Sequence, residues 1–121
     1  MSAALHRRLA DVPAVAEPEN ALTLWPLLAH ADSAADLSIT RVRLEGHHRR
    51  LRTDASTRVY AILEGGGSIT VGDDAPRPLT DGDVVVVPRG VAYHLDGPLT
   101  YVVINVPGFR DGDDIYLEED V

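Results

Sequence analysis

The chain has 121 residues, with 19 acidic and 11 basic side chains and a formal net charge of −8 when histidine is neutral. This length suits one domain with its own core and leaves little room for a second. The absence of cysteine excludes disulfides, thiolate metal sites and cysteine nucleophiles. The acidic balance argues against a nucleic-acid partner, because binding to phosphates needs an excess of cations. No apolar run reaches the roughly 18 residues of a membrane span, and the N-terminus lacks the apolar stretch of a secretory signal, so we expect a cytoplasmic protein with no membrane partner.

Residues 1–30 are expected to form an N-terminal arm of strand and loop. Pro13 and Pro18 interrupt any helical periodicity, and Trp25-Pro26 prevents a helix in the leucine-rich stretch. The arm carries more apolar surface than a loose segment needs, in Leu22, Leu24, Trp25, Leu27 and Leu28. We therefore expect it to pack across a partner subunit in a homodimer; the alternative is that it covers the edge of the chain's own barrel.

Residues 31–110 are expected to form the main domain, where short β runs alternate with turns rich in glycine, proline and aspartate. The predicted strands are 37–44, 49–53, 58–63, 67–72, 84–87, 91–95 and 99–106. This spacing is typical of an all-β sandwich or barrel. The continuous apolar run Val84–Val87 predicts a strand that is covered on both faces. The glycines Gly65–Gly67 predict a hairpin turn, because neither Lys-Ser/Thr nor a helix follows them as a phosphate-binding loop would require.

Residues 111–121 are expected to form an acidic C-terminal tail. Six acids gather here: Asp111, Asp113, Asp114, Glu118, Glu119 and Asp120. Such a run is typical of a solvated chain end that aids solubility, and less typical of an interaction segment.

Two segments, 46–65 and 82–97, resemble the two sequence motifs of the cupin superfamily, whose members are small jelly-roll β-barrels. The first family motif begins and ends with glycine, and Gly46 and Gly65 keep its spacing here. The second contains Gly, five residues and Pro-x-Gly, which Gly82 and Pro88-Arg89-Gly90 reproduce. The resemblance covers roughly residues 40 to 105. It implies an all-β fold, a cupin jelly-roll β-barrel with an N-terminal arm.

The metal-binding positions of this family are changed. Relatives hold a metal with His, His, Glu and His, and the matching positions here are Arg52, Asp54, Arg58 and Tyr93. Two fixed cations would repel a divalent ion, and a single carboxylate offers too few ligands for zinc, iron or manganese. The resemblance therefore implies a metal-independent cupin with no cofactor.

Three other histidines bear on that conclusion. His47 and His48 are adjacent, so on an extended chain they point to opposite faces, and we expect them to form an exposed loop pair before the motif strand. His94 follows Tyr93 and should face away from the pocket, unless the loop after Gly90 has gained a residue. In that shifted register His94 would turn inward, which keeps a metal-dependent enzyme with a shifted site as an alternative.

Strand alternation places Arg52 and Asp54 on one face of their strand, and Arg58 and Tyr60 on one face of the next. If the resemblance holds, these faces line the barrel interior, with Tyr93 opposite. A second buried guanidinium there needs a partner, because an unpaired buried cation costs several kcal/mol. Either Asp54 bridges both arginines, or a substrate carboxylate, phosphate or enolate binds the open fork as a small anionic ligand.

Proton transfer is the chemistry that this inventory favours, since the chain has no lysine or cysteine and Ser68 has no evident His-Asp partner. We assign catalysis to Asp54 and Tyr93, and substrate binding to Arg52, Arg58, Tyr60 and His94. The expected reaction is isomerisation, cyclisation, dehydration or decarboxylation of a small acidic or keto compound, which the resemblance places in biosynthetic pathways. The alternative is a non-catalytic cupin that binds a small anion or sugar acid.

Overall fold

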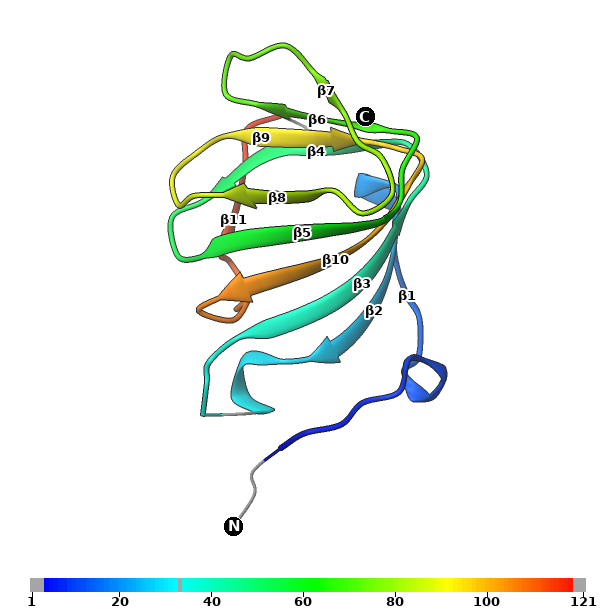
Figure 1. Cartoon of the computed structure of the whole chain (residues 1–121). Coiled ribbons are helices and arrows are strands. Elements are labelled where there is room, and N and C mark those ends of the chain that lie inside the picture. The colour runs from blue at the N-terminus through cyan, green and yellow to red at the C-terminus, as the bar shows by residue number, and fades with distance from the viewer. Residues whose placement is uncertain (1–3, 33, 119–121) are drawn as a thin grey trace.

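The computed structural model describes residues 4–32 and 34–118 and shows two antiparallel sheets that face each other as a barrel (Figure 1). Its strands are β1 (Val15–Glu17), β2 (Leu22–Leu28), β3 (Ser38–Leu44), β4 (His47–Thr53), β5 (Thr57–Glu64), β6 (Ser68–Val71), β7 (Arg77–Pro78), β8 (Val84–Val87), β9 (Tyr93–Asp96), β10 (Leu99–Val106) and β11 (Asp114–Tyr116). One sheet has the order β1-β2-β3-β10-β5-β8 and the other the order β11-β4-β9-β6-β7. The all-β fold class and the seven predicted strands are confirmed.

Helical structure in the described residues is limited to three short 3₁₀ turns: η1 (Leu9–Asp11), η2 (Pro18–Asn20) and η3 (His30–Asp32). Nowhere in this part of the chain is a helix long and apolar enough to cross a membrane. The core lies between the two sheets, where the alternating apolar side chains of both meet. Its fully buried members include Leu44, Leu51, Tyr93, Leu95 and Leu99.

The prediction that β8 is covered on both faces is wrong. Val85 and Val87 pack inward, but the side chains of Val84 and Val86 are 63% and 57% exposed. The reason is the position of β8 at the edge of an antiparallel sheet, which can carry apolar residues on both faces while burying only one.

The predicted hairpin at Gly65–Gly67 is also wrong, because β5 and β6 belong to different sheets and do not pair. The glycines instead form a corner that carries the chain from one sheet to the other. Backbones approach closely there: a Cβ on Gly67 would lie 1.9 Å from the carbonyl oxygen of Asp96, and one on Gly65 would lie 2.4 Å from that of Leu79. Only residues without a side chain fit such a corner.

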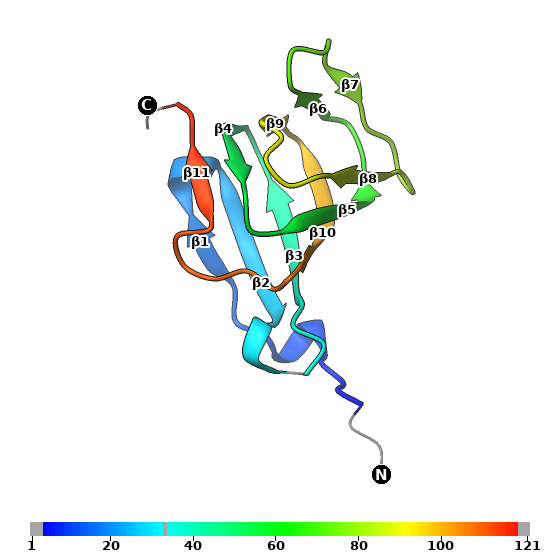
Figure 2. The ribbon, with the colours of Figure 1, turned by 90° about the vertical axis from the view of Figure 1, so that its left-hand side faces the viewer.

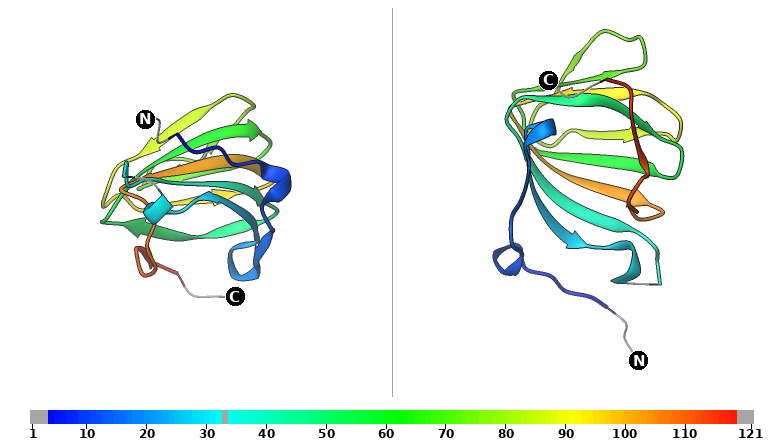
Figure 3. Two further views of the ribbon diagram at one scale, coloured as in Figure 1. Left: turned by 90° about the horizontal axis from the view of Figure 1, so that it is seen from below. Right: turned by 180° about the vertical axis from the view of Figure 1, so that it is seen from behind.

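The N-terminal arm joins the chain's own barrel. β2 pairs antiparallel with β3, and its Leu22 and Leu24 lie beside Leu44 and Val42. β1 and β2 thus extend the six-stranded sheet, while the segment before η1 leads away from it (Figure 3). The arm therefore covers the edge of its own sheet, which was the alternative drawn from the sequence, and packing across a partner subunit stays a prediction.

The prediction that residues 111–121 form a solvated tail is wrong for residues 114–118. Asp114–Tyr116 form β11, which pairs with β4 at the edge of the second sheet (Figure 2). Glu118 then accepts a hydrogen bond from the backbone N–H of Arg50. His47 of β4 contacts Glu118, and Arg58 of the opposite sheet pairs with Asp114, so the segment is held against the barrel. Glu119 and Asp120 lie outside the described residues.

Candidate active site

A cavity of about 230 Å³ opens between the sheets on the side where β1, β2 and β3 extend the six-stranded sheet. We call it the barrel cavity. Leu22, Leu24 and Pro26 of the arm form part of its apolar wall. Its ionisable lining comes from five strands and consists of Glu17, His48, Arg58, Tyr60, Tyr101 and Asp114. A larger hollow of about 430 Å³ between β7 and β8 has only Asp74, Arg77 and Asp83 as charged lining groups, of which the first two are well exposed. The barrel cavity is therefore the better candidate for chemistry.

Arg58 is the buried cation at the centre of this cavity. Its Nε donates to Asn105 Oδ1 at 2.6 Å, and its Nη1 donates to the Tyr93 hydroxyl at 3.1 Å. Its Nη2 forms a hydrogen-bonded ion pair with Asp114. Burial lowers the pKa of the Arg58 guanidinium, but Tyr93, Tyr60 and Asp114 outweigh burial and raise that pKa above its usual value. Arg58 is thus a fixed charge in a fixed position.

Three tyrosines surround this cation. The hydroxyls of Tyr60 and Tyr93 are 2.5 Å apart, and the ring of Tyr60 packs edge-on against the rings of both Tyr93 and Tyr101. Burial raises the pKa of the Tyr60 and Tyr101 phenols, so both are neutral hydrogen-bond donors at ordinary pH. Tyr60 and Tyr101 line the barrel cavity, whereas Tyr93 is fully buried behind Tyr60.

His48 adds an imidazole to the cavity. It starts the inward-facing positions of β4, and its Nδ1 lies 2.8 Å from the carbonyl oxygen of Arg49. A carbonyl only accepts hydrogen bonds, so the Nδ1 atom carries the proton and the Nε2 atom keeps a lone pair. Burial lowers the pKa of His48 and outweighs the Arg49 carbonyl and the Asp114 carboxylate, which raise it. His48 is therefore neutral at ordinary pH and has a free basic nitrogen.

A second group of contacts holds β4, β11 and η2 together behind His48. Asn20, fully buried, donates from Nδ2 to the Tyr116 hydroxyl at 3.0 Å and accepts from Arg49 Nε at 2.9 Å. The guanidinium of Arg49 lies 3.9 Å from the centroid of the Tyr116 ring, and that ring stacks on His48. Burial raises the pKa of Tyr116 to about 12. This layer fixes the ring plane of His48.

The predicted placement of Arg52 and Asp54 in the barrel is wrong. Arg52 Nε lies 3.2 Å from Asp54 Oδ1 on the outer surface, where the two side chains are 39% and 58% exposed. The physical reason is a register shift between His48 and Leu51 in the pairing of β4 with β9. A one-residue irregularity reverses the faces beyond it, so Leu51 and Thr53 point inward in place of the arginine and the aspartate.

The structure places the other predicted site residues as follows. Arg58, Tyr60 and Tyr93 lie inside the barrel, as strand alternation predicts. His94 does not: it lies on the outer face of β9, with Nε2 3.4 Å from Asp96 Oδ2. Its binding role in the pocket is thus contradicted, because β9 keeps a regular alternation that turns Tyr93 inward.

The expected second buried guanidinium is therefore absent from the described lining, and the fork of Arg58 is already bound by three partners of this chain. Asp114 balances its charge, and Glu17 adds a further carboxylate to the lining. The described lining of the cavity therefore carries two carboxylates and one guanidinium.

Sequence reasoning missed five groups that line the cavity: Glu17, His48, Tyr101, Asn105 and Asp114. The opposite facing of His47 and His48 was predicted and is confirmed, but the two residues begin β4 and are not a loop pair. Asn105 follows from regular alternation along β10, since it lies two residues beyond the inward Val103. No comparable signal exists for Asp114, whose strand forms only in the assembled sheet.

Comparison with known proteins rests on structure alone. No protein-family model matches the chain, and no curated protein matches it in sequence. Among solved structures, Pac13 from Streptomyces, a nucleoside dehydratase, matches with a TM-score of 0.81 at 16% identity, over 98% of this chain and 94% of that one. Ectoine synthase from P. lautus matches with a TM-score of 0.78 at 14% identity, over 98% and 93% of the two chains. KdgF from Halomonas sp. matches with a TM-score of 0.74 at 14% identity, over 89% and 96%. The chain therefore folds as a small cupin domain, a jelly-roll barrel with an N-terminal arm.

Proposed function

We propose that the protein is a proton-transfer enzyme of dehydratase type that acts in the barrel cavity on a small, polar β-hydroxy carbonyl compound. The observation that carries this proposal is the state of His48. It is a neutral imidazole whose proton is held on Nδ1 by a backbone carbonyl, so that Nε2 is available as a base.

The hydrogen bonds around Arg58 prepare the donor that complements this base, a hydroxyl that can donate to a substrate oxygen. Arg58 donates to the Tyr93 hydroxyl, so Tyr93 can donate to Tyr60 and leave the Tyr60 hydrogen directed to the cavity. A donor chain that ends on a fixed cation stabilises negative charge on a substrate oxygen. In this arrangement Tyr60 touches the substrate, and Tyr93 and Arg58 are positioning residues.

The reaction follows from these two halves. His48 Nε2 takes the proton from the carbon next to the substrate carbonyl, and the electron pair moves onto the carbonyl oxygen as an enolate, which Tyr60 stabilises. The enolate then re-forms the carbonyl and expels the β-hydroxyl, which leaves as water after taking the proton from the His48 imidazolium. One C–H and one C–O bond break, and one C=C bond forms. Return of that proton to the opposite face of the same carbon would give epimerisation from the same enolate.

Dehydration is favoured over cyclisation or decarboxylation by the structural neighbours. Pac13 is a nucleoside dehydratase, and solved structures of it with uridine include variants in which a histidine or a tyrosine is replaced. Histidine and tyrosine are also the groups that line the present cavity. A neutral substrate is favoured over the anionic ligand expected from the sequence, because Asp114 already pairs with Arg58 and Glu17 would repel an anion.

Metal independence also belongs to this proposal. His48 and Asp114 share the cavity with the Arg58 cation, which opposes a divalent ion at that place. Homodimer formation stays a prediction as well; a solution mass near 13.1 kDa rather than twice that value would contradict it.

The decisive experiment follows hydrogen exchange. The protein is incubated in D₂O with 4-hydroxybutan-2-one and related small β-hydroxy ketones and aldehydes, and NMR measures deuterium uptake next to the carbonyl. We expect uptake with the native chain and its loss in His48→Gln, with exposed His6→Gln as the matched control. A parallel thermal-shift series compares uridine with gluconate and phosphate. Ligand binding without deuterium exchange would favour the alternative of a non-catalytic binding protein. Tighter binding of gluconate than of uridine would favour the acidic ligand expected from the sequence.

A further inference from the structure

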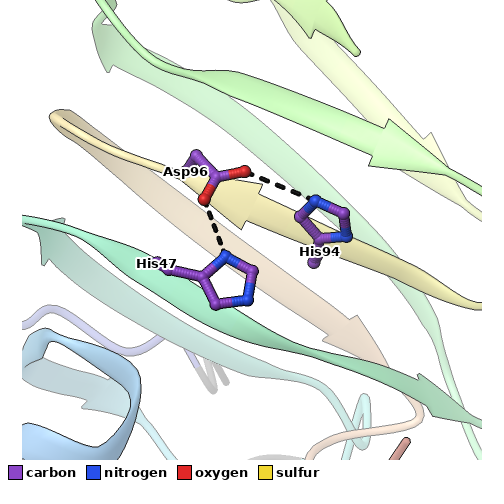
Figure 4. Close-up of side chains that lie close together, drawn as sticks. All are labelled: His47, His94 and Asp96. Atoms are coloured by element: carbon purple, nitrogen blue, oxygen red, sulfur yellow. Dashed lines mark hydrogen bonds and ion pairs between the residues drawn. The ribbon is translucent and has the colours of Figure 1, made fainter. Parts of the chain in front are cut away.

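The outer face of the five-stranded sheet carries a second group of ionisable residues, unrelated to the barrel cavity. We call His47, His94 and Asp96 the outer-face cluster (Figure 4). His47 is the direct cross-strand partner of Asp96, and His94 lies two residues before Asp96 on β9. Side chains at these positions share one face because strand residues alternate. The sheet therefore brings two imidazoles and one carboxylate together.

The distances within the cluster suit a common ligand. His47 Nδ1 lies 2.7 Å from Asp96 Oδ1, and His94 Nε2 lies 3.4 Å from Asp96 Oδ2. One ligand atom from each residue lies within 4.8 Å of the other two. Ligand atoms around one tetrahedral zinc ion lie about 3.3 Å apart, given zinc–ligand distances of about 2.0–2.1 Å. The ligand atoms of the cluster therefore lie at most about 1.5 Å beyond that spacing.

We propose that the outer-face cluster is a binding site for a divalent transition metal such as Zn²⁺, with His47, His94 and Asp96 as ligands. Imidazole and carboxylate together are the donor set that zinc and its neighbours in the first transition row prefer. Three protein ligands leave one position of a tetrahedral ion for water or an external group. The site lies on the opposite side of β4 from the cavity, since His47 and His48 face opposite ways.

The second ring nitrogen of His47 also has a partner of the kind found in metal sites. The other ring nitrogen of His47, Nε2, lies 2.8 Å from Glu118 Oε1, and the backbone N–H of Arg50 holds the same oxygen. A carboxylate that accepts from the far nitrogen of a ligating histidine is the usual outer partner in metal sites, where it fixes the ring and its tautomer. Glu118 is thus placed to orient His47 toward the ion.

His94 is not explained by a simple ion-pair network. Its Nδ1 is buried and has no hydrogen-bond partner among the described residues, and neither has Oγ1 of Thr70. Thr70 is the direct cross-strand partner of His94. A Thr70 oxygen that accepts from Nδ1–H would keep the proton there and leave the Nε2 lone pair for the metal. If the cluster served only as an ion pair, the His47 imidazolium with the carboxylates of Asp96 and Glu118 would be enough. That arrangement gives His94 no role.

Metal titration tests the proposal. The full chain is treated with EDTA, dialysed, and titrated with zinc chloride at pH 7.5 by calorimetry, with cobalt(II) absorption as a second readout of coordination. We expect one site per chain with a Kd below about 100 μM. His94→Asn and Asp96→Asn should each weaken binding by at least about tenfold. His6→Asn, an exposed histidine outside the cluster, should bind as the native chain does.

Three outcomes would overturn the proposal: no zinc binding below about 100 μM, binding unchanged in both His94→Asn and Asp96→Asn, or binding lost in His48→Gln. The last result would place the ion in the barrel cavity. Circular dichroism checks that each variant is folded, and His47→Gln replaces any variant that is not. The test is independent of the proposed reaction, because its readout is binding and not turnover.

Discussion

Two consecutive histidines, His47 and His48, sit in opposite environments on the two faces of β4. His48 lies inside the barrel, where burial lowers its pKa and leaves a neutral base. His47 lies outside, 43% exposed; burial lowers its pKa, but Asp96 and Glu118 together outweigh burial and raise it. The same side chain is thus a base on one face and a cation, or a metal ligand, on the other. Burial decides the state of one histidine and neighbouring charge decides the state of the other.

A comparison of the arginines leads to the same conclusion. Arg58 is buried and binds three partners, while Arg52 lies on the surface and pairs only with exposed Asp54 among the contacts seen. Both occupy positions that a cupin motif would use for a metal. One irregularity in β4 accounts for this difference, because it turns Arg52 outward and leaves Arg58 as the single guanidinium in the described lining of the cavity.

The largest expected effect separates the two histidines by chemistry. His48→Gln should lower the rate of deuterium uptake by the ketone probe by about 100-fold or more, since the general base is lost. His47→Gln should leave the rate unchanged, because its ring faces away from the cavity. Equal losses of the deuterium-uptake rate in both variants, measured by the same NMR assay, would contradict the assignment of catalysis to the inner face of β4.

The next effect separates the two arginines by stability. Arg58→Met should lower the free energy of unfolding by about 3 kcal/mol, because it leaves Asp114 without its ion-pair partner and Asn105 and Tyr93 without a donor. Adding Asp114→Asn should restore part of the loss. Urea unfolding measures both. A loss below about 1 kcal/mol for Arg58→Met would show that the buried pair is not a structural centre.

A third prediction concerns pH. The lowered pKa of His48 means that its contribution to stability is full above the ordinary histidine value of 6.5 and is lost as pH falls through its folded-state pKa. The raised pKa of His47 has the opposite sign: its contribution is full below 6.5 and is lost as pH rises through its folded-state pKa. NMR titration of the two imidazoles should therefore give midpoints on opposite sides of 6.5. The reverse order would contradict the assigned environments.

The smallest effect is expected for the exposed pair that the sequence placed in the site. Arg52→Gln and Asp54→Asn should each change the free energy of unfolding by less than about 1 kcal/mol, because surface ion pairs contribute little. Neither should change deuterium uptake. Loss of uptake in Asp54→Asn would return the catalytic site to the position predicted from the cupin motif.

Much of the fold could be predicted from the sequence, because turn-forming residues and the alternation of inward and outward side chains along a strand are local properties. The bounds of β8 and β10 agree with the predicted 84–87 and 99–106. Arg58, Tyr60 and Tyr93 were placed inside because β5 and β9 alternate regularly. The predicted catalytic role of Tyr93 and the predicted substrate-binding roles of Arg58 and Tyr60 stay predictions. Arg52 and Asp54 were misplaced because nothing in the amino-acid sequence of β4 indicates the extra residue that shifts its pairing with β9.

The fold class and the spacing of strands and turns were predictable from the sequence, since each depends on neighbours along the chain. Tertiary structure alone decided which of two adjacent histidines faces the cavity, which arginine is buried, and that Asp114 at the far end of the chain pairs with Arg58. Those outcomes depend on pairing between strands, where a shift of one residue exchanges the inner and outer faces.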